Sequence, residues 1–159
     1  MKKQILYIDM DGVLVDLGKE FERFFELHPY LRDRYQHNPD HIQGIFRNAP
    51  PIEGAIEGVN KLYESGKYDM FIATSAPWGN PQSSAEKRFW IEDHFGTMFH
   101  KRMFVTHRKD LLIGDYLIDD RTKNGAGDFK GEQLHFGWSW ETETYNKYPT
   151  WKSILDYLL

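Results

Sequence analysis

The chain has 159 residues, a formal net charge of −4 and no cysteine. Disulfides, thiolate nucleophiles and cysteine-ligated zinc are therefore excluded, and the absence of a basic block argues against a broad nucleic-acid surface. With 40% hydrophobic and 16% aromatic residues, the composition predicts one packed globular domain. No apolar run reaches membrane-spanning length, and Asp9 interrupts the first apolar run too early for a signal peptide. These features favour a cytoplasmic protein.

Short apolar strands alternate with amphipathic helices along the chain. In chain order we expect a strand at residues 4–8, helices at 17–28 and 50–66, a strand at 68–74, a helix at 83–96, strands at 102–106, 115–120 and 132–136, and a closing helix at 150–159. Asp16 and Thr150 are candidate N-caps, as is Ser83 or Ser84 for the helix at 83–96. The alternation predicts an α/β fold with a parallel, Rossmann-like sheet flanked by helices. The polar, proline-interrupted stretch before residue 50 predicts a small helical or irregular insertion after the first strand.

Polar side chains follow three of the expected strands at the point where each strand ends. These residues are Asp9 and Asp11 after the first strand, Thr74 and Ser75 after the second, and Asp119, Asp120 and Arg121 after the fourth. Ligands bind beyond the carboxyl ends of parallel strands, so we expect these groups to converge at one edge of the sheet. Carboxylates that share a pocket raise one another's pKa, and a hard divalent cation such as Mg²⁺ resolves that conflict. The sequence therefore predicts a magnesium site with an anionic group on its other side.

The spacing of Asp9 and Asp11 gives each carboxylate a chemical role. Residues two apart in an extended segment point to the same face. Asp9 can attack phosphorus as a nucleophile, while Asp11 protonates the leaving oxygen and later deprotonates the attacking water. Gly12 lets the backbone turn sharply out of the strand.

Three further side chains can hold the anionic group. Thr74 and Ser75 offer hydroxyl donors to phosphate oxygens, and Lys87, on the following helix, supplies a cation. Lys109, in the stretch THRKD, is the alternative cation for the same role. We favour Lys87.

Together these residues resemble the haloacid dehalogenase-like hydrolase superfamily. DMDGVLVD (9–16) is similar to its first motif, Asp-x-Asp-Gly-x-Leu-x-Asp, while FIATS resembles the second motif and LIDDR the fourth, with Lys87 in the place of the third. A closer resemblance is to the 5'(3')-deoxyribonucleotidases. It rests on the same motifs, on Glu86 and Lys87 followed by FWIEDHFG, and on the closing WKSILDYL. The motifs run from residue 9 to residue 121, most of the chain.

The resemblance implies a magnesium-dependent phosphatase that removes phosphate from deoxynucleoside monophosphates through an aspartyl-phosphate intermediate. It implies that Asp9 is the nucleophile and Asp11 the acid and base. It also implies that Asp9, the backbone carbonyl of Asp11, and Asp120 bind Mg²⁺, with Asp119 beside them. Thr74, Ser75 and Lys87 would hold the phosphate.

The resemblance also implies a cap, at about residues 17–50 of a single domain spanning 1–159. The cap contains no tryptophan. Candidate pocket residues are Phe21, Phe46, Trp78 and Arg121, with Phe24 and Tyr35 as further candidates. So short a cap either leaves the pocket open or needs a second subunit to complete it, which makes a homodimer one expected state. Trp138 and Trp140 either stack on a base or pack structurally.

Two alternatives stay open at this point. The same scaffold can serve another phosphate ester such as a sugar phosphate, a phosphomutase or a dehalogenase. Asp11 argues against the dehalogenase, because that chemistry has no alcohol leaving group to protonate. The second alternative is a non-catalytic phosphate-binding module, against which the complete set of motif residues argues. The expected partner is a small phosphate ester, with no membrane and no nucleic acid polymer.

Overall fold

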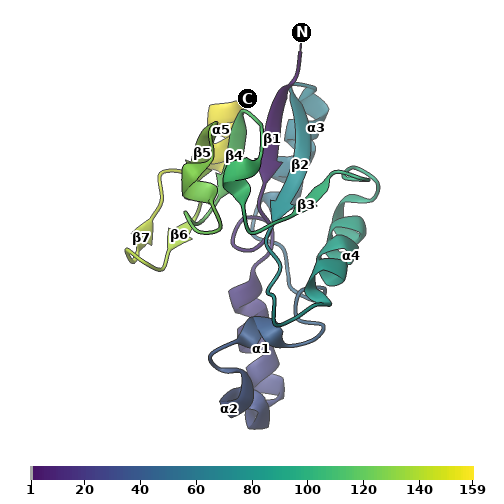
Figure 1. Cartoon of the computed structure of the whole chain (residues 1–159), viewed down its shortest axis with the longest axis vertical. Coiled ribbons are helices and arrows are strands. Elements are labelled where there is room, and N and C mark those ends of the chain that lie inside the picture. Colours follow the sequence, from purple (N-terminus) through teal and green to yellow (C-terminus); the bar gives the residue numbers. More distant parts are fainter. Residues whose placement is uncertain (1) are drawn as a thin grey trace.

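The computed structural model describes residues 2–159 and has at its centre a five-stranded parallel sheet of order β3-β2-β1-β4-β5 (Figure 1). The strands are β1 (Gln4–Ile8), β2 (Tyr68–Thr74), β3 (Met103–Val105), β4 (Tyr116–Asp119) and β5 (Glu132–His135). In the central strand, Ile8 lies opposite Ile72 of β2 and Ile118 of β4. The strands are apolar because both faces of the sheet are covered. The predicted parallel α/β fold is therefore confirmed.

The two faces of the sheet are covered in different ways. Helices α3 (Ala55–Ser65), α4 (Ser83–Phe95) and α5 (Trp151–Leu158) pack on one face, where they enclose the main core with the alternate side chains Leu6 and Ile8 of β1. Tyr7 points to the opposite face, which is covered by Phe129 and by two short 3₁₀ turns, Lys109–Leu111 and Ala126–Asp128. Within residues 2–159, every helix is too short or too polar to span a bilayer.

Two of the three predicted helix caps are confirmed. The Asp16 side chain accepts a hydrogen bond from Lys19 N at 3.2 Å, and Thr150 forms a capping box with Ser153. The prediction of Ser83 or Ser84 as the cap of α4 was wrong, because Gln82 is the N-cap residue and makes no side-chain cap bond. A preceding turn provides the backbone acceptor instead: the N–H of Ser83 donates to the carbonyl of Asn80.

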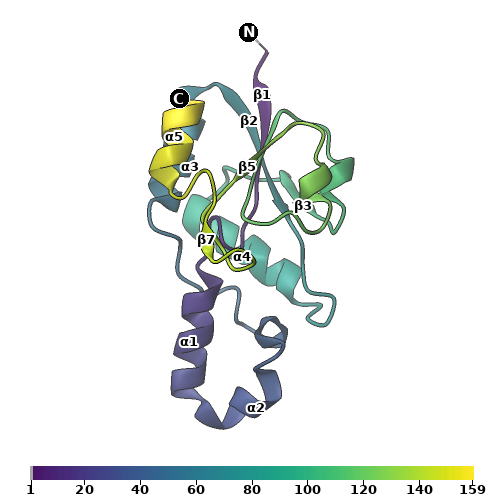
Figure 2. The same cartoon turned by 90° about the vertical axis from the view of Figure 1, so that its left-hand side faces the viewer.

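Residues 17–50, here called the inserted segment, lie beyond the carboxyl ends of the strands (Figure 2). The segment contains α1 (Leu17–Leu27), α2 (Arg32–Tyr35) and the 3₁₀ turns Pro29–Leu31 and Pro39–His41. It has a small core of its own, built from Phe25, Ile42, Ile45 and Phe46. This core lets a short, proline-interrupted stretch hold a defined shape.

Helix α4 fastens the inserted segment to the sheet. The Glu86 carboxylate accepts hydrogen bonds from the backbone N–H groups of Gly44 and Phe46, at 3.1 and 3.2 Å. Trp90 Nε1 donates to the carbonyl of Ala49 at 2.8 Å. Glu86 and Trp90 are buried, so water does not compete for these hydrogen bonds. The bonds fix the inserted segment above the sheet edge at which the predicted site lies.

A short antiparallel hairpin, which the sequence reading did not predict, follows the last strand of the sheet. It consists of β6 (Trp138–Ser139) and β7 (Thr144–Tyr145), with Trp138 opposite Tyr145. Gly137, at φ +72°, turns the chain out of β5 and into the hairpin.

Substitution of Gly58 tests the packing of α5 on α3. A Cβ at Gly58 would lie 2.6 Å from Cε3 of the buried Trp151, so we expect Gly58→Ala to lower the free energy of unfolding by about 1–3 kcal/mol. Gly18→Ala, in α1, is the matched control: the atom nearest to its Cβ would be 4.0 Å away, and higher helix propensity should add up to about 1 kcal/mol. Urea unfolding of both variants measures the difference, and shifts of the same sign would contradict this packing.

Candidate active site

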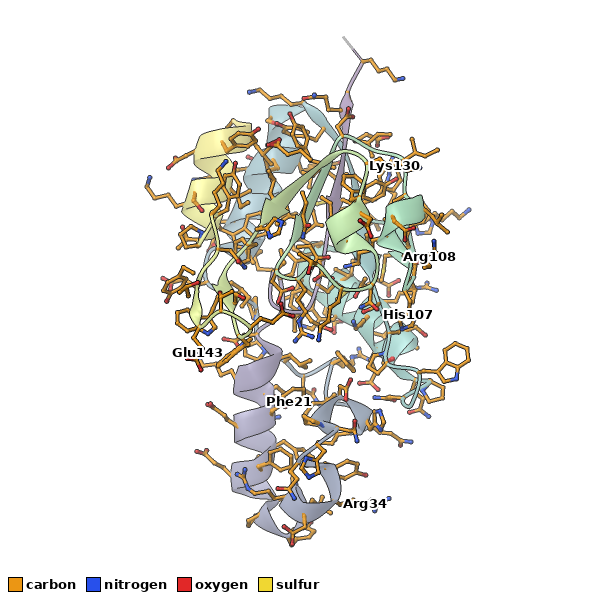
Figure 3. All side chains as sticks on the ribbon, turned by 60° about the vertical axis from the view of Figure 1, so that its left-hand side comes forward. Phe21, Arg34, His107, Arg108, Lys130 and Glu143 are labelled. Carbon is orange, nitrogen blue, oxygen red and sulfur yellow. The ribbon has the colours of Figure 1, made fainter. Side chains whose placement is uncertain are left out.

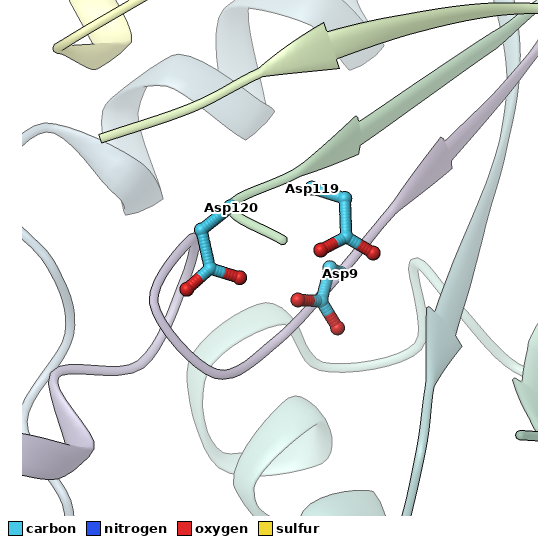
Figure 4. A group of neighbouring side chains, drawn as sticks. All are labelled: Asp9, Asp119 and Asp120. Atoms are coloured by element: carbon cyan, nitrogen blue, oxygen red, sulfur yellow. The ribbon is translucent and has the colours of Figure 1, made fainter. Parts of the chain in front are cut away.

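Three carboxylates from two neighbouring strands meet at the carboxyl edge of the sheet. Asp9 follows β1, Asp119 ends β4 and Asp120 follows it, and one oxygen from each lies within 4.8 Å of the others (Figure 4). Asp9 and Asp119 are buried, while Asp120 is partly buried. Hard divalent cations such as Mg²⁺ prefer such oxygen donors, so these three residues are the ones that could hold a metal ion.

The carboxylates of this cluster are electrostatically strained. Burial, followed by the charge of Asp9, raises the pKa of Asp120 to about 9 and that of Asp119 to about 7. Lys109 offsets part of the charge, because its Nζ lies 3.0 Å from Asp9 Oδ1 and 2.6 Å from Asp119 Oδ2. Burial lowers the pKa of Lys109, but the two carboxylates outweigh burial and raise it above its ordinary value. With one ammonium for three carboxyl groups, full ionisation of the cluster would leave an excess of negative charge.

A second buried lysine holds Asp11. Lys87 Nζ donates to Asp11 Oδ2 at 2.9 Å, to Thr74 Oγ1 at 2.8 Å and to the Ser75 carbonyl at 2.6 Å. The Asp11 side chain is therefore turned toward Lys87 and stands apart from the three clustered carboxylates. A fixed, buried ammonium is a strong hydrogen-bond donor for positioning a carboxyl group.

The other oxygen of Asp11 is left without a hydrogen bond within residues 2–159. Oδ1 is buried and has no hydrogen-bond partner among the described residues. Burial raises the pKa of Asp11, although the nearby charge of Lys87 lowers it in part. A raised pKa favours the protonated carboxyl group, and an oxygen without a partner can carry a proton toward a bound ligand.

Above these groups lies a cavity of about 1250 Å³ between the sheet, the inserted segment and the hairpin. Most of the predicted site residues line it: Asp9, Asp11, Ser75, Asp119, Asp120, Phe21, Phe46 and Arg121. Thr74 and Lys87 are fully buried behind Asp11 and do not line it. Lys109, the alternative to Lys87, does line it. The structure thus brings both lysines to the site, one at the cavity wall and one behind Asp11.

Trp78 lies outside this cavity, unlike Phe21, Phe46 and Arg121. Its side chain is 91% exposed and is absent from the cavity lining. The reason is the turn that contains it: Asn80 N–H bonds back to Pro77, and Asn80 Nδ2 donates to Asp40 of the inserted segment at 3.0 Å. The turn is held by Asn80 rather than by the tryptophan. Phe24 and Tyr35 pack against the core of the inserted segment instead of lining the cavity.

Two asparagines that sequence reasoning missed support the site. Asn124 Nδ2 donates to Ser75 Oγ at 3.3 Å, and Asn146 Nδ2 donates to the carbonyl of Asp120 at 3.4 Å. Asn124 precedes Gly125 in an Asn-Gly pair, a visible turn signal. The sequence carries no sign of the partners that these side chains reach, because both contacts join segments far apart in the chain.

The pKa of Asp120 predicts how stability depends on pH in metal-free buffer. The unfolded carboxyl loses its proton near about pH 4, whereas the folded one keeps it to about pH 9. The free energy of unfolding should therefore fall as the pH rises between these values, by at most about 1.4 kcal/mol per pH unit from this group. Asp120→Asn should remove this part of the slope. Asp93→Asn, at an exposed ion pair with Arg47, should retain it.

Denaturant unfolding in EDTA at pH 6, 7 and 8 makes this comparison. An unchanged slope in Asp120→Asn would show that Asp120 titrates as an ordinary exposed carboxyl group.

Comparisons with known proteins identify the family of the chain. The profile of the family described as 5' nucleotidase, deoxy (pyrimidine), cytosolic type C protein matches residues 18–159. A putative 5'(3')-deoxyribonucleotidase of Vibrio phage KVP40 is 41% identical over 156 residues, which cover 98% of this chain and 85% of the relative. The human cytosolic-type 5'(3')-deoxyribonucleotidase is 31% identical over 138 residues, covering 72% of this chain and 69% of the relative.

Among solved structures, a haloacid dehalogenase-like family hydrolase of Streptococcus pneumoniae shares the fold. Its TM-score is 0.57 at 14% sequence identity, with 98% of this chain and 90% of that chain covered. The predicted superfamily resemblance is therefore confirmed at the level of the fold. On the family profile and the similarity of its relatives, the chain belongs to the cytosolic type C 5'-nucleotidase family of phosphate-monoester hydrolases.

Proposed function

We propose that this chain is a magnesium-dependent 5'(3')-deoxyribonucleotidase that works through an aspartyl-phosphate on Asp9. The observation that carries the proposal is that two aspartates of one loop have different surroundings. Asp9 lies in the carboxylate cluster, while Asp11, two residues on, is held apart by Lys87 with one oxygen unpartnered. The names of the phage and human relatives support deoxynucleoside monophosphates as the substrate class.

The donor set of the cluster fits Mg²⁺. Its three carboxylates supply only oxygen, and their mutual repulsion raises the pKa of Asp119 and Asp120, strain that a cation would relieve. Asp9, Asp119 and Asp120 would hold the ion, together with the backbone carbonyl of Asp11. When bound, Mg²⁺ supplies positive charge that polarises the phosphoryl group and offsets its repulsion by Asp9.

The protein's own residues then account for both halves of the reaction. A carboxylate oxygen of Asp9 attacks phosphorus as the ester P–O bond breaks, and Asp11 gives its proton to the departing nucleoside oxygen. In the second half, Asp11 takes a proton from a water molecule as that water attacks the phosphorus of the aspartyl-phosphate. Inorganic phosphate leaves, and both aspartates return to their starting states.

The phosphate is bound by groups with unequal access to the cavity. Ser75 and Lys109 line the cavity and can contact phosphoryl oxygens directly. Thr74 and Lys87 lie one layer deeper and keep Asp11 and the Ser75 carbonyl in place. Phosphate binding thus begins with Ser75 and Lys109, and Lys87 holds the general acid.

The inserted segment serves as the cap of a single domain. It closes one side of the cavity with Phe21 and Phe46, opposite the sheet edge that carries the aspartates. A cytoplasmic location is supported by the cytosolic type of the human relative, although a mouse relative is named as mitochondrial. The homodimer expected from the short cap stays a prediction.

Release of phosphate from a panel of monoesters tests the proposal. We expect turnover to be led by deoxynucleoside monophosphates, to be lost in EDTA and to return with Mg²⁺. Asp9→Asn should lose activity by a factor on the order of 10³ or more, because the attacking atom is gone. Turnover led by sugar phosphates would keep the mechanism and overturn the substrate class. A folded protein inactive on every ester would favour the non-catalytic phosphate-binding module.

Two leaving groups separate the role of Asp11 from that of Asp9. Asp11→Asn should slow hydrolysis of a deoxynucleoside monophosphate by about 10²- to 10⁴-fold, because the alkoxide then leaves without a proton. With p-nitrophenyl phosphate, whose phenolate leaves without protonation, formation of the aspartyl-phosphate should slow by about tenfold or less. Rapid-quench measurement of the first turnover gives both rates. Equal losses would argue that Asp11 acts on the nucleophile or the fold instead.

A further inference from the structure

The hairpin β6–β7 carries a cluster of exposed aromatic rings. Trp138, Trp140 and Tyr145 are 37%, 79% and 66% exposed, and the ring centroid of Trp138 lies 4.9 Å from that of Tyr145 and 6.3 Å from that of Trp140. The other indoles near the sheet behave differently, since Trp90 and Trp151 are buried in the main core. Trp138 and Tyr145 pair across the hairpin, and Trp140 keeps most of its surface free for a ligand.

The hairpin is rooted beside the catalytic carboxylates. The N–H of Phe136 donates to the carbonyl of Asp119, and Asn146 joins the two ends of the hairpin by donating from Nδ2 to Phe136 and to Asp120. All three aromatic residues of the hairpin line the same cavity as Asp9 and Asp11. In Figure 3 the hairpin, marked by Glu143, and α1, marked by Phe21, both lie at the end of the molecule where the strands terminate. A ligand with its phosphate on Asp9 thus shares one cavity with these rings.

The inserted segment offers fewer free rings to the same cavity. Phe46 is 2% exposed, and Lys87 Nζ lies 4.8 Å from the centroid of its ring, so this ring is already packed against the site's own lysine. Phe21 is only partly exposed. The indole of Trp140 has far more surface left for stacking than either phenylalanine.

The charge of the hairpin indicates which part of a ligand it receives. Glu141 and Glu143 lie between the two strands, and Glu141 is 4.0 Å from Lys123, whose charge it offsets. These carboxylates would repel a second phosphate group and so disfavour a polynucleotide. They do not disfavour a neutral aromatic ring, which stacks on tryptophan with little regard to sequence.

From this juxtaposition we propose that the β6–β7 hairpin, through Trp140 supported by Trp138 and Tyr145, is a subsite that stacks on the nucleobase of a mononucleotide substrate. This inference rests on the proposed nucleotidase function and adds to it the residues that recognise the base. The inserted segment then closes the sugar and phosphate end of the cavity, and the hairpin selects esters that carry an aromatic ring.

Two substrates that differ only in the base test the subsite. kcat/KM is measured for deoxyuridine 5'-monophosphate and for 2-deoxyribose 5-phosphate in the unaltered protein, Trp140→Ala, Trp140→Phe and Tyr63→Ala. Trp140→Ala should lower kcat/KM for the nucleotide about five- to 150-fold, the equivalent of about 1–3 kcal/mol of stacking, and leave the base-free ester unchanged. Trp140→Phe should recover most of the loss. Tyr63→Ala, at an exposed aromatic residue of α3 outside the cavity, should match the unaltered protein.

The outcomes separate this inference from the proposed function. Equal losses for both esters would show that Trp140 acts through the fold, and no loss for the nucleotide would show that the base binds elsewhere; either result overturns the subsite. If the unaltered protein hydrolyses neither ester, the proposed function fails. In that case, calorimetric titration measures the affinity for both esters of the Asp9→Asn variant and of the double variant Asp9→Asn/Trp140→Ala. This comparison tests the subsite independently of turnover. A drop in affinity confined to the nucleotide supports it, and equal affinities overturn it.

Discussion

The structure depends on keeping four aspartates together at one edge of a parallel sheet. Two buried lysines stabilise this arrangement, because between them they form ion pairs with three of the four aspartates. Lys109 bridges Asp9 and Asp119, while Lys87 takes Asp11 and turns it away from the others. Removing a partner from a buried ion pair leaves an uncompensated charge, so each lysine is needed by the fold as well as by the site. In the described part of the chain Asp120 is left without a lysine, and this excess of carboxyl groups is what supports the proposed cation site.

Because Asp9 and Asp11 bond to different lysines, two chemically identical side chains have different surroundings. Asp9 lies in the carboxylate cluster and accepts a hydrogen bond from the ammonium of Lys109, which also bonds Asp119. Asp11 is bonded to a different ammonium, that of Lys87, and burial raises its pKa despite that contact. The sharp turn at Gly12 makes this possible. Its φ is +80°, and a Cβ there would lie 2.2 Å from Asp120 Oδ2. Only glycine lets the loop carry Asp11 past the carboxylate cluster.

The sequence was sufficient to predict a parallel sheet, the alternation of strands and helices along the chain, and the polar residues at the strand ends. Such positions are readable because short apolar runs end abruptly in polar residues, as at Asp9, Thr74 and Asp119. The two caps at Asp16 and Thr150 were readable because capping is a local interaction. The cap of α4 was misjudged because a backbone carbonyl of an adjacent turn replaced the serine side chain.

The contacts between distant segments could not be predicted. Lys109 and Lys87 have the same local appearance, a lysine in a polar stretch, and only the fold places one at the cavity wall and the other behind Asp11. Trp78 and Trp140 both follow strands in glycine-containing loops, yet one lies outside the cavity and the other lines it. Tertiary position separates the members of each pair, and one sequence carries no periodic signal for it.

The attachment of the inserted segment to α4 restricts how the site can open. Glu86, which bonds Gly44 and Phe46, is the sequence neighbour of Lys87, which bonds Asp11. One turn of α4 therefore both attaches the inserted segment and supports Asp11. A swing of the whole segment would break these bonds and disturb Asp11 at the same time. The α1–α2 end of the segment has no bond to Glu86, so bending there would leave Asp11 and its support undisturbed.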